Sequence, residues 1–107
     1  ESLAAFDAIV KSGKARVIGA SNFTAERLEE ALGVSAAHGL ARYETLQPHY
    51  NLVEREVEIE LQPLCVREGI SVIPYFSLAS GFLTGKYRSA ADKSKSLRGG
   101  RMQDVIP

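Results

Sequence analysis

The chain has 107 residues, a length that predicts one domain or part of one. Its 13 basic and 13 acidic residues balance, so no excess of positive charge favours a nucleic-acid partner or a membrane surface. No apolar run approaches the ~20 residues of a membrane-spanning helix, and we expect neither nucleic acid nor membrane among the partners.

A single cysteine, Cys65, cannot form an internal disulfide bond, which is typical of a protein in a reducing compartment. The sequence shows no secretory signal, so we expect a cytoplasmic protein. The chain begins at Glu1, without a methionine, in a stretch that already has a helical pattern. We therefore expect a piece of something longer.

The first half of the chain contains two predicted helices, each followed by a strand. Residues 2–12 carry apolar side chains at helical spacing, and residues 15–19 form a short apolar run typical of a strand. Thr24 is a suitable N-cap for a second helix, Gly39 ends that helix, and residues 43–47 predict the second strand. The side chains expected to face inward from the second helix are Leu28, Ala31, Leu32, Ala36 and Ala37.

The second half adds one more helix, one more strand and a tail. A third helix is predicted from about Glu54 to Glu68, with a kink or a restart at Pro63. A strand over residues 70–75 follows it. Residues 88–107 mix basic residues with serine and glycine and are typical of a solvated loop or a frayed tail.

The predicted strands begin at residues 15, 43 and 70, so helices and strands alternate at nearly equal intervals. This alternation predicts an α/β fold with parallel strands and right-handed crossovers. A doubly wound sheet and a (β/α)8 TIM barrel both fit, but no GxGxxG fingerprint follows any strand, which weakens the first. Since a whole barrel needs about 250 residues, this chain would supply less than half of one.

The most informative stretch is residues 72–88, where an apolar strand leads into a loop of small residues. The backbone N–H groups and hydroxyls of such a loop can contact a phosphate, and Lys86 adds a positive charge at its end. Tyr75, at the strand tip, can stack on a flat heterocycle. These features predict a nucleotide site. The small residues of the loop are Ser77, Ala79, Ser80, Gly81, Thr84 and Gly85.

Polar side chains also follow the other two strands, at the carboxyl ends where parallel α/β folds bind ligands. Ser21 and Asn22 follow the first strand, and Gln47 ends the second. Neighbouring strands lie ~4.8 Å apart, so a hydroxyl, two amides and the Tyr75 ring would converge. Side-chain amides both donate and accept hydrogen bonds, which suits a carboxamide such as that of nicotinamide.

Each of these residues also has a purely structural interpretation. Asn22 could simply shape the turn before the second helix. Gln47 could satisfy backbone groups at a strand end, and Tyr75 could belong to the core. Their predicted meeting at three successive strand ends favours the functional interpretation.

The sequence shows no catalytic group beside this binding constellation. His49 lies next to the predicted site, but no acid or nucleophile is evidently paired with it. His38 stands at a helix end and is expected on the surface. The alternating glutamates of residues 54–60 are typical of a solvated face, and no residues have metal-ligand spacing.

Three motifs in this order resemble those of the aldo-keto reductases: KSGKARVIGASNF at residues 11–23, LQPHYNL at 46–52 and YFSLASGFLTGKYR at 75–88. With the helices between them, they cover nearly the whole chain up to about residue 88. The resemblance implies a (β/α)8 barrel that binds NADPH, with this chain as the fifth to seventh strands and their preceding helices. It also implies an oxidoreductase that reduces aldehydes or ketones to alcohols, with a small-molecule carbonyl substrate.

The resemblance assigns roles to the residues singled out above. Ser21, Asn22 and Gln47 match residues that hydrogen-bond the nicotinamide carboxamide. Tyr75 matches the aromatic residue that stacks on the nicotinamide ring, and Lys86 matches a basic residue that contacts the pyrophosphate in related regulatory members. The loop that holds the pyrophosphate corresponds to Phe76, Ser77, Leu78, Ala79 and Ser80.

The resemblance also has departures and leaves alternatives. Phe76 stands where a serine is common, so only its backbone can serve, and Arg98 loosely matches a residue of a covering loop. The family's Asp, Tyr, Lys and His catalytic group lies on earlier strands, so we expect the 107 residues alone to be inactive. The alternatives are a non-catalytic NADP(H)-binding subunit of the potassium-channel β type and a partial product with no activity alone.

Overall fold

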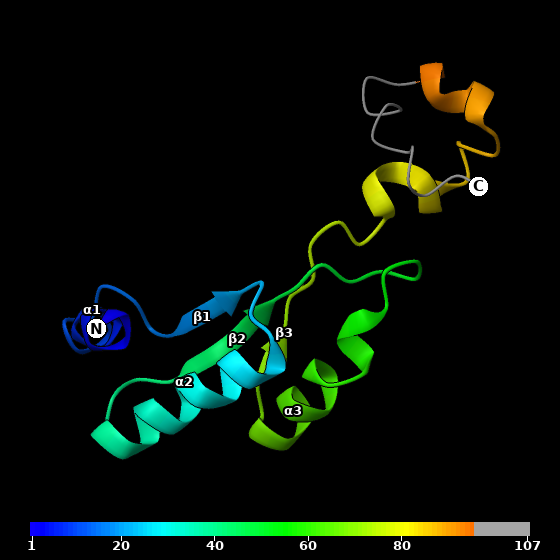
Figure 1. Cartoon of the computed structure of the whole chain (residues 1–107). Helices are drawn as coiled ribbons and strands as arrows, with labels where there is room; N and C mark the ends of the chain where they lie inside the picture. Colours follow the sequence, from blue (N-terminus) through cyan, green and yellow to red (C-terminus); the bar gives the residue numbers. More distant parts are fainter. Residues whose placement is uncertain (96–107) are drawn as a thin grey trace.

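The computed structural model describes residues 1–95, which form three helix–strand units followed by two 3-10 helices (Figure 1). The α-helices are α1 (Ser2–Lys11), α2 (Ala25–His38) and α3 (Leu61–Glu68). The strands are β1 (Ile18–Ser21), β2 (Tyr43–Gln47) and β3 (Ser71–Val72). The 3-10 helices are η1 (Glu56–Glu58), which precedes α3, and η2 (Ala79–Thr84) and η3 (Ala90–Lys95), which follow β3.

The three strands form one parallel sheet in the order β1-β2-β3, which confirms the predicted α/β alternation. Ala20, Leu46 and Val72 are register partners across the sheet, and Ser21 pairs with Gln47 at its carboxyl edge. Helices α2 and α3 lie on the same side of the sheet in Figure 1, and their apolar side chains pack on this row. The buried core consists of Ala20, Leu28, Tyr43, Leu46, Leu64, Cys65 and Ile70.

Helix α2 ends where the sequence predicts, because its capping residues act as expected. The Thr24 hydroxyl accepts the Arg27 backbone N–H at 3.2 Å, and Gly39 closes the helix in the left-handed conformation, with φ of 62°. Helix α2 thereby holds β1 and β2 at the spacing that a parallel crossover requires.

The inward face of α2 is shorter than predicted. Leu28 is buried and Ala31 and Leu32 are half-buried, but Ala36 and Ala37 are exposed, and Ser35 is buried in their place. The chain returns over the last turn of α2 after Gly39, and the Ser35 hydroxyl donates to the Ala41 carbonyl at 3.0 Å. A polar contact therefore replaces the expected apolar one at this end of the helix.

The predicted third helix consists of two pieces, and Pro63 does not break it. Helix η1 ends at Glu58, and α3 begins at Leu61. Pro63 is the third residue of α3, within the first turn, where a backbone N–H has no partner inside the helix. The missing N–H of proline therefore does not harm α3, and the restart lies a few residues earlier than predicted.

Two strands differ in extent from their predictions. Strand β1 covers residues 18–21 instead of 15–19, with a register shift between Ile18 and Gly19. Strand β3 has two residues instead of six, because Pro48, the residue after β2, has no N–H to donate to the neighbouring strand. Bonds in the other direction continue past β3: the Ile73 N–H donates to the Leu46 carbonyl at 2.8 Å, the Tyr75 N–H donates to the Pro48 carbonyl at 3.0 Å, and Tyr75 forms a parallel bridge with His49.

The two 3-10 helices that follow β3 lie apart from the sheet. The described chain is elongated, measuring 54 × 29 × 20 Å, and η2 and η3 project away from the sheet (Figure 1). Within residues 88–95 of the predicted tail, the Asp92 carboxylate accepts the backbone N–H groups of Arg88 and Ser89 at 2.8 and 2.9 Å. Arg98 lies outside the described residues.

No helix in the described part is both long enough and apolar enough to cross a membrane.

Candidate functional site

The polar side chains predicted at the strand ends lie together at the carboxyl edge of the sheet. Ser21 and Gln47 are register partners, and the Ser21 hydroxyl donates to the Gln47 carbonyl at 2.9 Å. The backbone N–H of Asn22 donates to the same carbonyl at 3.4 Å, and the Tyr75 hydroxyl donates to Asn22 Oδ1 at 2.7 Å. We call Ser21, Asn22, Gln47 and Tyr75 the strand-end edge.

Asn22 combines a structural and a chemical role at this edge. Its φ of 57° lies in the left-handed region, which asparagine tolerates better than most residues, and it turns the chain from β1 toward α2. Asn22 therefore shapes the turn before α2, as the structural interpretation predicts. The same conformation presents its side-chain oxygen to Tyr75, while the amide N–H groups of this exposed side chain remain donors.

Tyr75 is half-buried and belongs to an aromatic group rather than to the core. The His49 imidazole stacks on it with centroids 5.3 Å apart and an interplanar angle of 11°. The Phe76 ring contacts Tyr75 edge-on, with centroids 5.1 Å apart. Among residues 1–95, His49 is the only aromatic side chain that stacks face to face on the Tyr75 ring, so the opposite face suits a second flat group.

The loop that follows Tyr75 is not a plain coil. We call it the Phe76–Lys86 loop. Helix η2 occupies its second half and is interrupted at Ser80 and Gly81, where φ is 56° and 108°. The loop lines an open cavity of about 410 Å³. The predicted residues Phe76, Ser77, Leu78, Ser80 and Lys86 line it together with Gly81 and Thr84, whereas Ala79 is buried.

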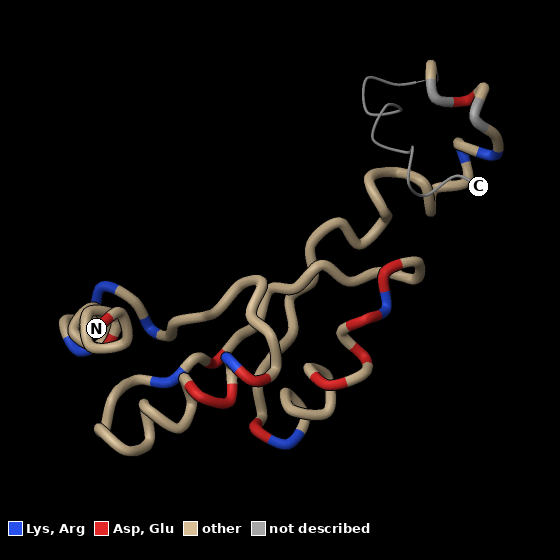
Figure 2. The backbone as a smooth tube through the Cα atoms, viewed as in Figure 1, with Lys and Arg blue, Asp and Glu red and all other residues tan. Residues whose placement is uncertain are grey.

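The charge distribution separates this loop from the rest of the chain (Figure 2). Acidic residues gather along α2 and residues 54–60, whereas residues 71–85, from β3 through η2, carry no charge and are followed by Lys86 and Arg88. The Lys86 ammonium lies 5.1 Å from the centroid of the Tyr87 ring and lines the same cavity as the small loop residues. No acidic side chain of this segment opposes a negatively charged ligand there.

The sequence interpretation missed Asn51, which contacts this loop. Asn51 is 7% exposed, and its Nδ2 donates to the Phe76 carbonyl at 3.0 Å. Its Oδ1 accepts the backbone N–H groups of Val53 and Glu54 at 2.8 and 2.9 Å. An asparagine just after a strand is a known turn former, but that signal does not reveal a contact with a segment 25 residues away.

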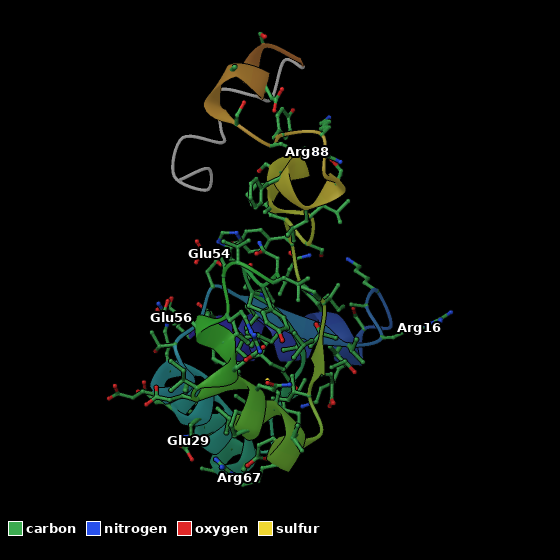
Figure 3. The ribbon with its side chains drawn as sticks, turned by 90° about the vertical axis from the view of Figure 1, so that its right-hand side faces the viewer. Arg16, Glu29, Glu54, Glu56, Arg67 and Arg88 are labelled. Carbon is green, nitrogen blue, oxygen red and sulfur yellow. The ribbon has the colours of Figure 1, made fainter. Side chains whose placement is uncertain are left out.

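The shifted ionisable groups lie away from the strand-end edge. A bidentate contact with Arg55, helped by the Tyr50 hydroxyl, lowers the pKa of the Glu58 carboxyl. Burial raises the pKa of the Cys65 thiol, which keeps it protonated and unreactive. The other glutamates of residues 54–60 are exposed, as expected for a solvated face, and Figure 3 shows Glu54 and Glu56 on the surface. Within residues 1–95 no group of His, Cys, Asp or Glu could hold a metal ion.

Comparisons of this sequence with known proteins identify its family. The model of the Aldo/keto reductase family matches residues 1–103. The chain is 35% identical over 89 residues to versiconal hemiacetal acetate reductase of Aspergillus parasiticus. It is 41% identical over 75 residues to aldo-keto reductase YhdN of Bacillus subtilis, and 38% identical over 81 residues to protein tas of Escherichia coli.

These matches cover 83%, 70% and 76% of this chain, but only 26%, 21% and 23% of the three relatives. The chain therefore spans about a quarter of the length of the curated relatives it matches. The family match over nearly all of its residues agrees with the parallel helix–strand units seen here, which are part of the (β/α)8 barrel of this family. The chain belongs to the aldo/keto reductase family.

Proposed function

We propose that this chain forms the NADP(H)-binding wall of an oxidoreductase that reduces aldehydes or ketones to alcohols. The observation that carries the proposal is the meeting of Ser21, Asn22, Gln47 and Tyr75 at one edge of the sheet. Family membership supports the reaction class, and the relative from Aspergillus parasiticus is named as a reductase.

The donors and acceptors at the strand-end edge fit a nicotinamide carboxamide. Tyr75 occupies Asn22 Oδ1, so Asn22 presents its amide N–H groups, which can donate to the carboxamide oxygen. The exposed Gln47 side chain offers an acceptor for the carboxamide N–H groups. The Ser21 hydroxyl is held by the Gln47 carbonyl and keeps a lone pair for a further donor.

Tyr75 suits the ring of the same cofactor. Its free face can stack on the nicotinamide, while His49 supports the opposite face of the phenol ring. The bond to Asn22 fixes the phenol in its plane, so the ring needs little reordering when a ligand arrives. Stacking on one face of nicotinamide leaves the other face open toward a carbonyl substrate.

The Phe76–Lys86 loop suits the phosphates. Its cavity is lined by small polar residues and Lys86, and it lies directly after Tyr75 in the chain. A pyrophosphate attached to a nicotinamide on Tyr75 would reach this cavity, where backbone N–H groups, hydroxyls and one ammonium can contact it. Phe76 would contact the phosphates through its backbone and not through its side chain.

When bound, NADPH would supply the hydride. The described residues would bind and orient the nicotinamide, and the Tyr75 hydroxyl at the strand-end edge is held by Asn22 Oδ1, so we assign none of them as the general acid. We propose that the proton donor belongs to another part of the whole protein, which we place in the cytoplasm. Purified alone, the 107 residues should consume no NADPH with a reactive aldehyde, and turnover above the buffer rate would contradict this.

Cofactor binding tests the proposal with one matched pair of variants. Gln47→Ala removes an exposed amide at the strand-end edge, and Gln62→Ala removes an exposed amide from α3. We expect Gln47→Ala to raise the Kd for NADPH about tenfold, because one hydrogen bond to the carboxamide is lost. Gln62→Ala should leave the Kd unchanged. Titration of the purified chain by calorimetry measures both, and equal Kd values for the two variants would contradict the proposed site.

A further inference from the structure

Asn51 joins two segments that are far apart in the sequence. It lies in the connection between β2 and η1, and its Nδ2 donates to the carbonyl of Phe76, the first residue of the Phe76–Lys86 loop. The same carbonyl accepts the Ala79 backbone N–H at 2.8 Å, which closes the first turn of the loop. Asn51 therefore binds the oxygen on which that turn depends.

This turn needs support because its backbone is strained. Phe76, Ala79 and Ser80 have φ values of 54°, 49° and 56°, in the left-handed region that residues with a Cβ disfavour. Such conformations persist only where the surroundings hold them. The other hydrogen bonds of this turn, such as those from Gly81 and Leu83 to the Leu78 carbonyl, remain within the loop. The Asn51 bond, by contrast, reaches the loop from another element.

The two hollows beside the loop show how the contact could affect a ligand. Asn51 lines a hollow of about 500 Å³ with His49 and Glu54, on one side of Phe76 and Ser80. Phe76 and Ser80 also line the cavity of about 410 Å³ that contains Lys86. The turn is thus a wall between the two, held by Asn51 from one side and facing the proposed phosphate position on the other.

The two halves of the Asn51 amide serve different segments. Its Oδ1 bonds to Val53 and Glu54 shape the turn of its own connection, and an aspartate could accept both equally well. Its Nδ2 bond to Phe76 requires a donor, which an ionised aspartate lacks. If Asn51 served only its own turn, Asp would replace it without consequence for the loop.

We propose that Asn51 is a positioning residue, whose amide holds the Phe76 carbonyl and thereby sets the backbone of residues 76–80 for the cofactor phosphates. The identity of that ligand rests on the proposed function. Asn51→Asp keeps both acceptor contacts, removes the donor and places a negative charge against the carbonyl. Gln62→Glu is its matched control, because it exchanges an amide for a carboxylate on the exposed face of α3.

Two measurements on the purified chain test the inference. Amide hydrogen exchange reports the turn directly, and we expect Ala79 N–H to exchange about tenfold faster in Asn51→Asp than in the unmodified chain or in Gln62→Glu. The exchange of Ile73 N–H, which donates to Leu46 in the sheet, should stay unchanged. NADPH titration should show a Kd raised about tenfold in Asn51→Asp only.

The outcomes separate this inference from the proposed function. If Ala79 exchanges equally fast in all three proteins, Asn51 does not hold the loop and the inference is wrong. If exchange rises but the Kd stays unchanged, the turn does not position the cofactor, and the inference is also wrong although the proposed function survives. If the unmodified chain binds no NADPH, the proposed function is wrong, and so is the role of Asn51 in positioning the cofactor. The hydrogen exchange of the Ala79 N–H then still tests whether Asn51 holds the turn at Phe76.

Discussion

The strand-end edge and the Phe76–Lys86 loop meet at Tyr75, but they are held in place differently. The first is an extension of a sheet, in which register pairs Ser21 with Gln47 and a buried row of side chains fixes the register. The second leaves the sheet and adopts left-handed backbone at three residues that are not glycine. Order in the first comes from the core, whereas order in the second depends on a few contacts.

The largest effect should come from the core beneath the strand-end edge. Leu46 is fully buried in the central strand, and Leu46→Ala should lower the free energy of unfolding by about 2–5 kcal/mol. Val66→Ala removes a side chain that is 78% exposed and should change it by less than about 0.5 kcal/mol. Urea denaturation of both variants measures the difference, and similar losses would show that the sheet lacks the core described here.

A smaller effect is expected where β1 and β2 approach each other closely. A Cβ at Gly19 would overlap the Thr45 hydroxyl and lie 3.2 Å from the Thr45 carbonyl, so Gly19→Ala should cost about 1–3 kcal/mol. Adding Thr45→Ala should restore part of the loss. The same change at Gly33 in α2 meets open space and should stabilise by roughly 0.5–1 kcal/mol. Thermal unfolding shows whether each substitution raises or lowers the stability. A stabilising Gly19→Ala would refute the close approach of β1 and β2.

The loop should respond to substitution without affecting the sheet. Gly81 has a φ of 108°, and an added Cβ would lie 3.2 Å from the Tyr87 ring, so Gly81→Ala should destabilise the loop by about 1 kcal/mol or more. The Leu83 N–H should then exchange faster, while the Ile73 N–H in the sheet stays protected. Parallel acceleration of both amides would mean that loop and sheet unfold as one unit.

The smallest effect concerns α1, which is tied to the sheet region through Asp7. Its carboxylate bonds Lys11 at 2.7 Å and the Ala41 N–H at 2.8 Å, and these contacts lower the pKa of Asp7 below its ordinary value of 3.8. Because the native state favours the charged form, the stabilisation is complete above pH values near 3.8 and is lost as the pH falls through the lowered pKa.

Asp7→Asn should therefore flatten the acid side of the stability curve. Denaturation measured between about pH 2 and 6 compares the two chains, and the unmodified chain should lose its advantage at the acid end. Lys11→Gln provides the control from the partner side, since it removes the first contact and leaves the Ala41 bond. An unchanged pH dependence in Asp7→Asn would contradict the assigned role.

Much of the architecture could be predicted because it is encoded locally. Helix α2 starts and ends at residues whose caps are visible in the sequence, and the regular alternation predicts parallel strands. The predictions were wrong where a contact outside the helix or strand decides the outcome. The Ser35 hydroxyl bonds the Ala41 carbonyl of the chain that returns after α2, and β3 is short because Pro48, on the neighbouring segment, has no N–H to donate to it.

The candidate site shows the same division. The meeting of Asn22 and Tyr75 follows from strand order alone, so the sequence predicts it. The stacking of His49 on Tyr75 and the bond from Asn51 to Phe76 depend on pairing that continues past the strand ends. No local pattern contains that information.

The most direct test of the central claim is a titration of the labelled chain with NADPH, followed by nuclear magnetic resonance of the side-chain amides. Asn22 and Gln47 lie at the strand-end edge, while Gln62 reports from α3 in the same spectrum. We predict saturable shifts of the Asn22 and Gln47 amide signals, with Gln62 unmoved. Shifts at Gln62 alone, or no shift at Asn22 and Gln47 when NADPH is in large excess, would contradict the account.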